Sequence, residues 1–171
     1  MAVSRVFLVG PMGAGKTTIG KLLADDLHLE FIDVDREIET RSGVDIPWIF
    51  DREGEPGFRI RESAALSELS QLESVLISTG GGAVLSADNR KVMSATGTVV
   101  YLHTSVDEQV RRTSRDRKRP LLQNDDPARV LAELMAIREP LYRDVADIIV
   151  DTDGRSPKTV AQDIATRLRQ L

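Results

Sequence analysis

The sequence predicts an α/β protein in which a parallel sheet is covered by helices on both faces. Five short apolar runs alternate with segments whose apolar residues recur at helical spacing. The runs that indicate buried strands are residues 6–9, 31–35, 75–78, 98–102 and 148–150. Strands that alternate with helices along a chain are typical of a three-layered α/β/α architecture with a parallel sheet.

Length and composition restrict the class of protein further. The 171 residues suit one domain, and a net charge of −4 argues against a protein built to bind nucleic acid. The chain has no cysteine, which excludes disulfides and thiolate metal sites. The N-terminal residues do not have the pattern of a signal peptide, and no apolar run reaches the length of a membrane span. We therefore expect a cytoplasmic monomer with no membrane or nucleic-acid partner.

A glycine-rich segment follows the first predicted strand. Gly10-Pro-Met-Gly-Ala-Gly-Lys16-Thr17 fits the phosphate-binding pattern Gly-x-x-x-x-Gly-Lys-Ser/Thr, and a helix with apolar residues 19, 22, 23 and 27 follows it. Gly13 and Gly15 allow positive φ angles and a close approach of backbone N–H groups to phosphate. Lys16 is expected to meet the β- and γ-phosphates, and the Thr17 hydroxyl to bind Mg²⁺.

Two further strands end in residues that suit a ligand site. The second ends in Asp33 and Asp35, and the third runs into Gly80-Gly81-Gly82. In a parallel sheet the carboxyl ends of the strands face the ligand crevice. Asp33 is either a helix cap or a metal-site carboxylate, and these two roles are compatible. Three glycines exceed the need of a tight turn, so they suggest that a ligand approaches the backbone there.

The helices around these strands carry arginines. After a short helix over 36–42, Asp45 and Pro47 predict another short helix, and residues 54–57 a turn. Helical periodicity resumes over 58–72, where Arg59 and Glu62 form an i,i+3 pair that is ordinarily solvated. The helix that begins at Asp126–Pro127 is expected to break or bend at Glu139–Pro140, directly after Arg138.

A strongly basic segment lies between the fourth strand and that helix. Six cations fall within nine residues, namely Arg111, Arg112, Arg115, Arg117, Lys118 and Arg119. Such a run is usually a solvated surface. In a protein with a phosphate-binding loop, a basic segment over about 113–127 is better explained as a lid that supplies cations to phosphates.

The remaining motifs distinguish between classes of nucleotide-binding protein. Asp51-Arg-Glu-Gly54 resembles part of a GTP switch, but no strand precedes it and no Asn-Lys-x-Asp motif occurs. A motor or transporter ATPase usually has an acidic residue at the end of an apolar strand, where this chain has Thr79 and three glycines. A small-molecule kinase fits best. A nucleotide sensor without turnover is the alternative from another class.

The acceptor is expected to be a small acid with several hydroxyl groups. Arg59 and Arg138 come from two helices near the crevice, and guanidinium groups bind carboxylates in a bidentate manner. Asp35 would accept hydrogen bonds from hydroxyl groups. The residues alone do not name this acid, and gluconate is one acid with this chemistry.

Over residues 5–168 the sequence resembles the shikimate kinases. The motifs that carry the resemblance are the phosphate-binding loop at 10–17, Asp33-x-Asp35, Gly57-Phe58-Arg59-x-x-Glu62, the glycines at 80–82, Arg119-Pro-Leu-Leu122, Arg138 before Pro140-Leu-Tyr142, and Arg155-Ser-Pro157. The resemblance implies a P-loop NTPase fold of the nucleoside monophosphate kinase type, with strand order 2-3-1-4-5. It also implies transfer of the γ-phosphate of ATP to the 3-hydroxyl of shikimate, a step in chorismate and aromatic amino acid biosynthesis.

The resemblance also implies roles for individual residues, with helices over about 36–66 binding shikimate. ATP would be bound by Met12, Gly13, Ala14, Gly15, Lys16, Thr17, Arg112, Arg119 and Arg155. Thr17 and Asp33 would hold Mg²⁺. Shikimate would be bound by Asp35, Arg59, Gly80, Gly81, Gly82, Arg138, Phe50 and Phe58. The catalytic residues would be Lys16, Asp35 and Arg119, of which Asp35 orients or deprotonates the 3-hydroxyl.

Overall fold

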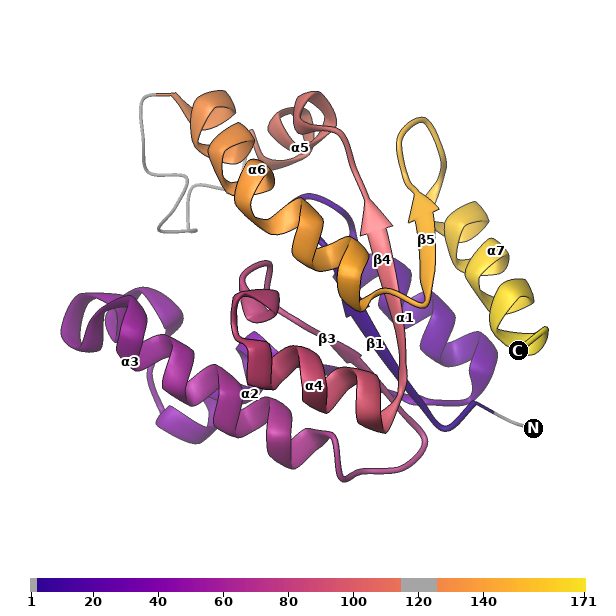
Figure 1. Ribbon diagram of the computed structural model, residues 1–171, viewed down its shortest axis with the longest axis horizontal. Coiled ribbons are helices and arrows are strands. Elements are labelled where there is room, and N and C mark those ends of the chain that lie inside the picture. The colour runs from indigo at the N-terminus through magenta and orange to yellow at the C-terminus, as the bar shows by residue number, and fades with distance from the viewer. Residues whose placement is uncertain (1–2, 115–125) are drawn as a thin grey trace.

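The computed structural model describes residues 3–114 and 126–171, which contain a five-stranded sheet in the order β2-β3-β1-β4-β5 (Figure 1). All four neighbouring pairs of strands are parallel. The strands are β1 (Arg5–Val9), β2 (Glu30–Asp33), β3 (Val75–Ser78), β4 (Thr98–His103) and β5 (Ile148–Asp151). This order and direction confirm the predicted fold class.

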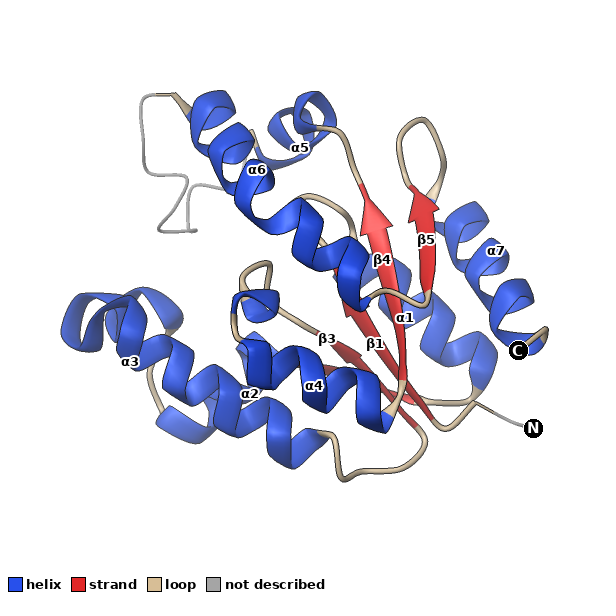
Figure 2. Cartoon of the chain, viewed as in Figure 1, coloured by secondary structure: helices blue, strands red, loops and turns tan. Residues whose placement is uncertain are grey.

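Helices cover both faces of the sheet, as Figure 2 shows. Val6 and Leu8 of β1 pack on the side of α1 (Lys16–Leu27) and α7 (Pro157–Arg169). Phe7 and Val9 point to the opposite face, where the core includes residues of α2 (Val34–Ser42), α3 (Ile46–Leu69), α4 (Ala87–Thr96) and α6 (Pro127–Val145). Because side chains alternate along a strand, a continuous apolar run supplies both core layers.

Polar caps begin the helices where the sequence predicts them. The side chain of Asp45 accepts a hydrogen bond from the backbone of α3, and Asp126 does the same for α6. Ser105 caps α5 (Val106–Thr113) and Ser156 caps α7. These side chains satisfy N–H groups that have no partner within the helix.

One predicted interruption is confirmed and another is wrong. Helical backbone stops at Gly54, whose φ is +71° and ψ 178°, so a kink within the predicted turn at 54–57 separates two helical stretches of α3. Of the break or bend expected at Pro140, the break is wrong, because α6 continues to Val145. Beyond Pro140, Tyr142 and Val145 are buried in the core. This burial outweighs the local cost of proline, which is about 3 kcal/mol in a helix interior.

The sheet and its connections bring the predicted ligand segments to one edge. The phosphate-binding loop follows β1, Asp33 ends β2, and the three glycines follow β3 before a 3-10 turn, η1 (Ala83–Leu85). Figure 1 shows η1 between α3 and α6. Among the described residues, no helix is long and apolar enough to cross a membrane.

Candidate active site

The phosphate-binding loop has the backbone that its glycines predict. Gly13 and Gly15 have φ angles of +80° and +88°, in the left-handed region. Lys16 begins α1, and its Nζ donates hydrogen bonds to the carbonyl oxygens of Gly10 at 2.6 Å and Pro11 at 2.9 Å. The ammonium group is therefore held over the loop in which a nucleotide phosphate would bind.

Asp33 caps a helix and also lies beside Thr17. Its Oδ1 caps α2 by accepting hydrogen bonds from the backbone N–H groups of Asp35 at 2.9 Å and Arg36 at 3.3 Å. Its Oδ2 lies 3.5 Å from the Thr17 hydroxyl oxygen. A hydroxyl and a carboxylate fit Mg²⁺, which prefers oxygen ligands and is usually held by one or two carboxylates together with substrate phosphates. Among the described residues, no group of three or more acidic or histidine side chains is placed to hold a metal ion.

Arg112 and Arg155 meet at the turn that follows β5. Arg112 donates hydrogen bonds to the carbonyl oxygens of Gly13 at 3.0 Å and Thr152 at 3.2 Å. Arg155 donates to the Asp151 carbonyl and forms an ion pair with Asp163 at 3.1 Å. Arg112 thus connects the phosphate-binding loop to this turn, which also contains Arg155.

The three glycines after β3 lie against four functional side chains. A Cβ atom on Gly80 would lie 3.0 Å from Glu62 Oε2 and 3.1 Å from Asp35 Oδ1, and one on Gly81 would lie 3.3 Å from Arg138 Nη1. A Cβ on Gly82 would lie 2.7 Å from Arg59 Cζ. The glycines are therefore required for close approach, and they bring the predicted acceptor residues Asp35, Arg59 and Arg138 to one loop.

Arg59 and Glu62 form a buried pair rather than a solvated one. Their side chains are joined by an ion pair of 2.8 Å, and the Glu62 side chain is only 1% exposed. Glu62 Oε2 has no hydrogen-bond partner among the described residues. Burial raises the pKa of Glu62 above its usual value, although the Arg59 charge acts in the opposite direction. Glu62 thus holds the Arg59 guanidinium at the glycines.

Glu62 was assigned no site role from the sequence, although a signal was present. On α3 it shares the buried stripe of Phe58, Leu66 and Leu69. An acidic residue on an apolar stripe is seldom buried without a partner. This pattern distinguishes Glu62 from an ordinary surface pair.

Two aromatic rings lie beside Arg59. The ring centroids of Phe50 and Phe58 are 4.9 Å apart, and the Arg59 guanidinium carbon lies 5.3 Å from the Phe58 centroid. Phe58 is buried, whereas Phe50 is partly exposed. The pair forms an apolar wall next to a cation, which suits a small ring that carries a carboxylate.

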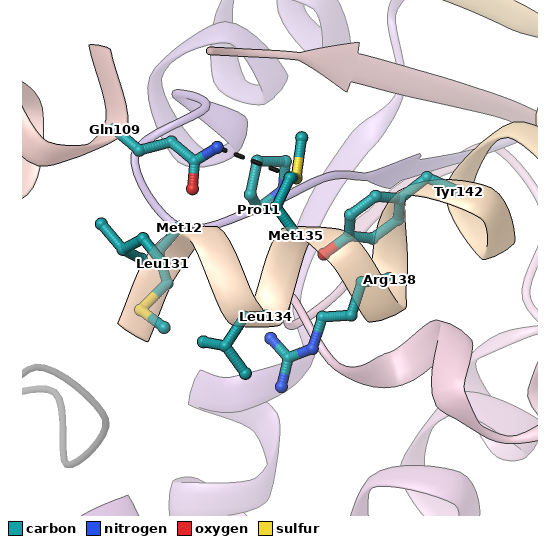
Figure 3. A pocket seen from close by; sticks show the side chains of 8 residues that line it. All are labelled: Pro11, Met12, Gln109, Leu131, Leu134, Met135, Arg138 and Tyr142. Atoms are coloured by element: carbon teal, nitrogen blue, oxygen red, sulfur yellow. Dashed lines mark hydrogen bonds between the residues drawn. The ribbon is translucent and has the colours of Figure 1, made fainter. Parts of the chain in front are cut away.

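Arg138 lies close to the phosphate-binding loop. It lines a small pocket together with Pro11 and Met12 of that loop and with Leu134 and Tyr142 of α6 (Figure 3). Only 6% of Arg138 is exposed. A Cβ atom on Gly81 would also lie 3.6 Å from the Gly10 carbonyl oxygen. Arg138 and part of the phosphate-binding loop therefore line one pocket.

One predicted site residue cannot be located. Arg119, together with Arg115, Arg117, Lys118 and most of the predicted lid, lies outside the described residues.

Comparison with known proteins identifies the family. The family model described as shikimate kinase matches residues 12–169. A shikimate kinase from Pseudomonas syringae pathovar tomato is 58% identical over 97% of this chain and 96% of its own length. One from Pseudomonas aeruginosa is 59% identical with the same coverage.

Solved structures agree. Shikimate kinase from Acinetobacter baumannii, in complex with shikimate, superposes with a TM-score of 0.96 at 47% identity, covering 98% of this chain and 94% of that one. A gluconokinase from Sinorhizobium meliloti has a TM-score of 0.64 at 17% identity, with 99% and 93% coverage, and shares the fold alone. From its sequence, its fold and the grouping of its candidate site residues, the chain belongs to the shikimate kinase family.

Proposed function

We propose that this protein transfers the γ-phosphate of ATP to the 3-hydroxyl of shikimate. The observation that carries the proposal is the position of Gly81, whose missing side chain leaves 3.3 Å to Arg138 Nη1 and 3.6 Å to the Gly10 carbonyl. A carboxylate held at Arg138 would therefore lie next to the phosphate-binding loop. Phosphoryl transfer requires such positioning more than it requires covalent chemistry from the protein.

In this proposal the donor phosphates bind at residues 12–17. Backbone N–H groups of the loop and the N-terminus of α1 hold the phosphates, and Lys16 moves from the loop carbonyls to the phosphates. Arg112 and Arg155 flank the adenine. Thr17 and Asp33 hold Mg²⁺, which when bound offsets negative charge on the phosphates. Arg119 is assigned to the phosphates on the sequence motif alone.

The acceptor binds on the other side of the crevice. Arg59 and Arg138 hold the carboxylate with help from the Gly81 N–H, and the neighbouring glycines keep this space open. Phe50 and Phe58 pack beside the ring. Asp35 accepts a hydrogen bond from the 3-hydroxyl and orients it for attack on the γ-phosphate. The whole chain, residues 1–171, acts as one domain.

A direct assay distinguishes the possible functions. Formation of ADP is measured with ATP and Mg²⁺ in the presence of shikimate, of gluconate, or of no acceptor. We expect ADP formation to depend on shikimate. Turnover with gluconate alone would make the protein a kinase for a different acid, and binding of ATP without turnover would indicate a nucleotide sensor. The expectations of a cytoplasmic location and of a monomer remain predictions from the sequence.

A further inference from the structure

Tyr142 lies at the point where two parts of the carboxylate site meet. It is fully buried, and its hydroxyl donates a hydrogen bond of 2.5 Å to the Gly81 carbonyl. Arg138 precedes it by one helical turn on α6, and both side chains line the same pocket (Figure 3). A Cβ atom on Gly81 would lie 3.3 Å from Arg138 Nη1 and 3.7 Å from the Tyr142 hydroxyl. The hydroxyl and the guanidinium therefore contact the same residue of the loop.

The Tyr142 ring is held rigidly. It stacks on the ring of Tyr101, with centroids 5.0 Å apart and planes inclined by 28°. Tyr101 is also fully buried, and its hydroxyl donates to Glu139, which forms an ion pair with Arg143. Because the ring is already fixed, its hydroxyl is held in one direction, and no freedom of this side chain is lost when a ligand binds.

The Tyr142 hydroxyl stays protonated at neutral pH. Burial raises the pKa of Tyr142, and this effect outweighs the positive charge of Arg138, which lowers it. The proton is therefore available for the Gly81 carbonyl, and the hydroxyl oxygen can still accept a hydrogen bond from the Arg138 guanidinium.

We propose that Tyr142 is a positioning residue of the carboxylate site, because its one hydroxyl orients both the backbone at Gly81 and the guanidinium of Arg138. The inference rests on the proposed function, which assigns these two groups to the shikimate carboxylate. It adds to that function a residue that does not contact the substrate. Without the Tyr142 hydroxyl, the loop at Gly81 and the Arg138 guanidinium would each adopt more orientations. Binding of the carboxylate would then have to restrict these orientations.

The first test is the variant Tyr142→Phe, which keeps the ring and its stacking. Loss of a buried hydrogen bond that orients a charged group corresponds to roughly a tenfold change in affinity. We expect the KM for shikimate to rise by about this factor. The KM for ATP should not change, because the Tyr142 hydroxyl donates to Gly81 of the acceptor loop. The kcat should change less than the shikimate KM.

Tyr101→Phe is the matched control. It removes the same atom from the neighbouring ring of the stacked pair, but that hydroxyl points to Glu139. We expect a lower melting temperature and an unchanged KM for shikimate. If both variants raised the shikimate KM equally, the effect would come from general loosening of the core, and the inference would be wrong.

A second acceptor makes the test specific for the carboxylate. The methyl ester of shikimate keeps the hydroxyl groups but lacks the negative charge. Tyr142→Phe should raise the KM for shikimate and leave that for the ester unchanged, so that discrimination between them decreases. An equal rise for both, or a lower melting temperature with an unchanged shikimate KM, would assign Tyr142 a structural role only. No turnover of shikimate by the unmodified protein would instead overturn the proposed function and this inference with it.

Discussion

Gly80, Gly81 and Gly82 lie where a methyl group would occupy space that other side chains use. None of the three has a φ angle in the left-handed region. Their role is therefore not conformational, in contrast to Gly13 and Gly15. Each glycine leaves room for a different charged side chain. A larger residue at one of these positions should therefore allow the protein to fold but disturb the binding site.

Gly82→Ala tests this distinction. The new Cβ would lie 2.7 Å from Arg59 Cζ, at the far end of a flexible side chain. Arg59 can move away, so the protein should fold while its guanidinium leaves the carboxylate site. We expect the shikimate KM to rise by at least ~10-fold, as for loss of hydrogen bonds to a charged group. The KM for ATP should remain unchanged.

Gly43→Ala provides the control for Gly82→Ala. Gly43 has a φ of +76° with open space around its Cβ position, so alanine there strains the backbone without displacing a side chain. Stability should fall by about 1 kcal/mol, and the shikimate KM should not change. A normal shikimate KM in Gly82→Ala would contradict the proposed position of Arg59.

Asp35→Asn tests the role of the carboxylate nearest the expected hydroxyl group. Asp35 lies in the first turn of α2, with Oδ1 3.1 Å from the Cβ position of Gly80. We expect kcat to fall by at least ~10²-fold, at the lower end of acid–base contributions. Glu37→Gln, on the same helix but paired with Arg41 at the surface, should leave kcat unchanged. A near-normal kcat with a raised KM would leave Asp35 as a binding residue only.

Among the secondary-structure elements, local signals predicted the strands and the helix starts well. Asp45, Asp126 and Ser156 cap the expected helices because a side-chain cap depends on a few adjacent residues only. The interruption at Gly54 was predicted from local residues, whereas the break at Pro140 was predicted wrongly because packing decides it. Beyond Pro140, Tyr142 and Val145 are buried in the core, which favours a continuous helix across the local defect.

Gly54→Ala tests the kink in α3. Gly54 has φ +71° and ψ 178°, a backbone conformation that is essentially restricted to glycine. We expect the free energy of unfolding to fall by roughly 1–3 kcal/mol, the cost of such strain, as measured by urea denaturation. Arg52→Ala, at an exposed position two residues earlier, should change it by less than about 0.5 kcal/mol. Equal effects would show that the kink stores no strain.

Across the whole molecule, the sequence indicated which segments meet but not how their side chains pair. Parallel strands end at one edge of the sheet, so the loop at 10–17, Asp33 and the glycines at 80–82 were expected together. Glu62 Oε2 lies 3.0 Å from the Cβ position of Gly80, and Tyr142 donates a hydrogen bond to Gly81, so residues far apart in the chain meet. The apolar stripe of α3 can indicate that Glu62 is buried, but no local pattern encodes these partners, because they depend on how α3 and α6 pack against the sheet.

Because α3 and α6 both supply arginines to the crevice, a bound acid should stabilise the molecule as a whole. At 100 times its dissociation constant, a ligand that binds only the folded state adds about 2.7 kcal/mol. For a chain of this size, that corresponds to a rise in melting temperature of roughly 5–11 °C. Shikimate should produce this shift in the unmodified protein.

Arg138→Ala should lose most of the shikimate shift at the same concentration and keep the shift produced by ATP with Mg²⁺. The reason is that the proposed function assigns Arg138 to the acceptor carboxylate, and Lys16 and Thr17 to the nucleotide. Arg169→Ala removes an equally charged side chain from α7, where Arg169 pairs with Asp26, and should keep both shifts. Thermal unfolding of the three proteins with each ligand measures this. Loss of the ATP shift alone in Arg138→Ala would place Arg138 in the nucleotide site instead.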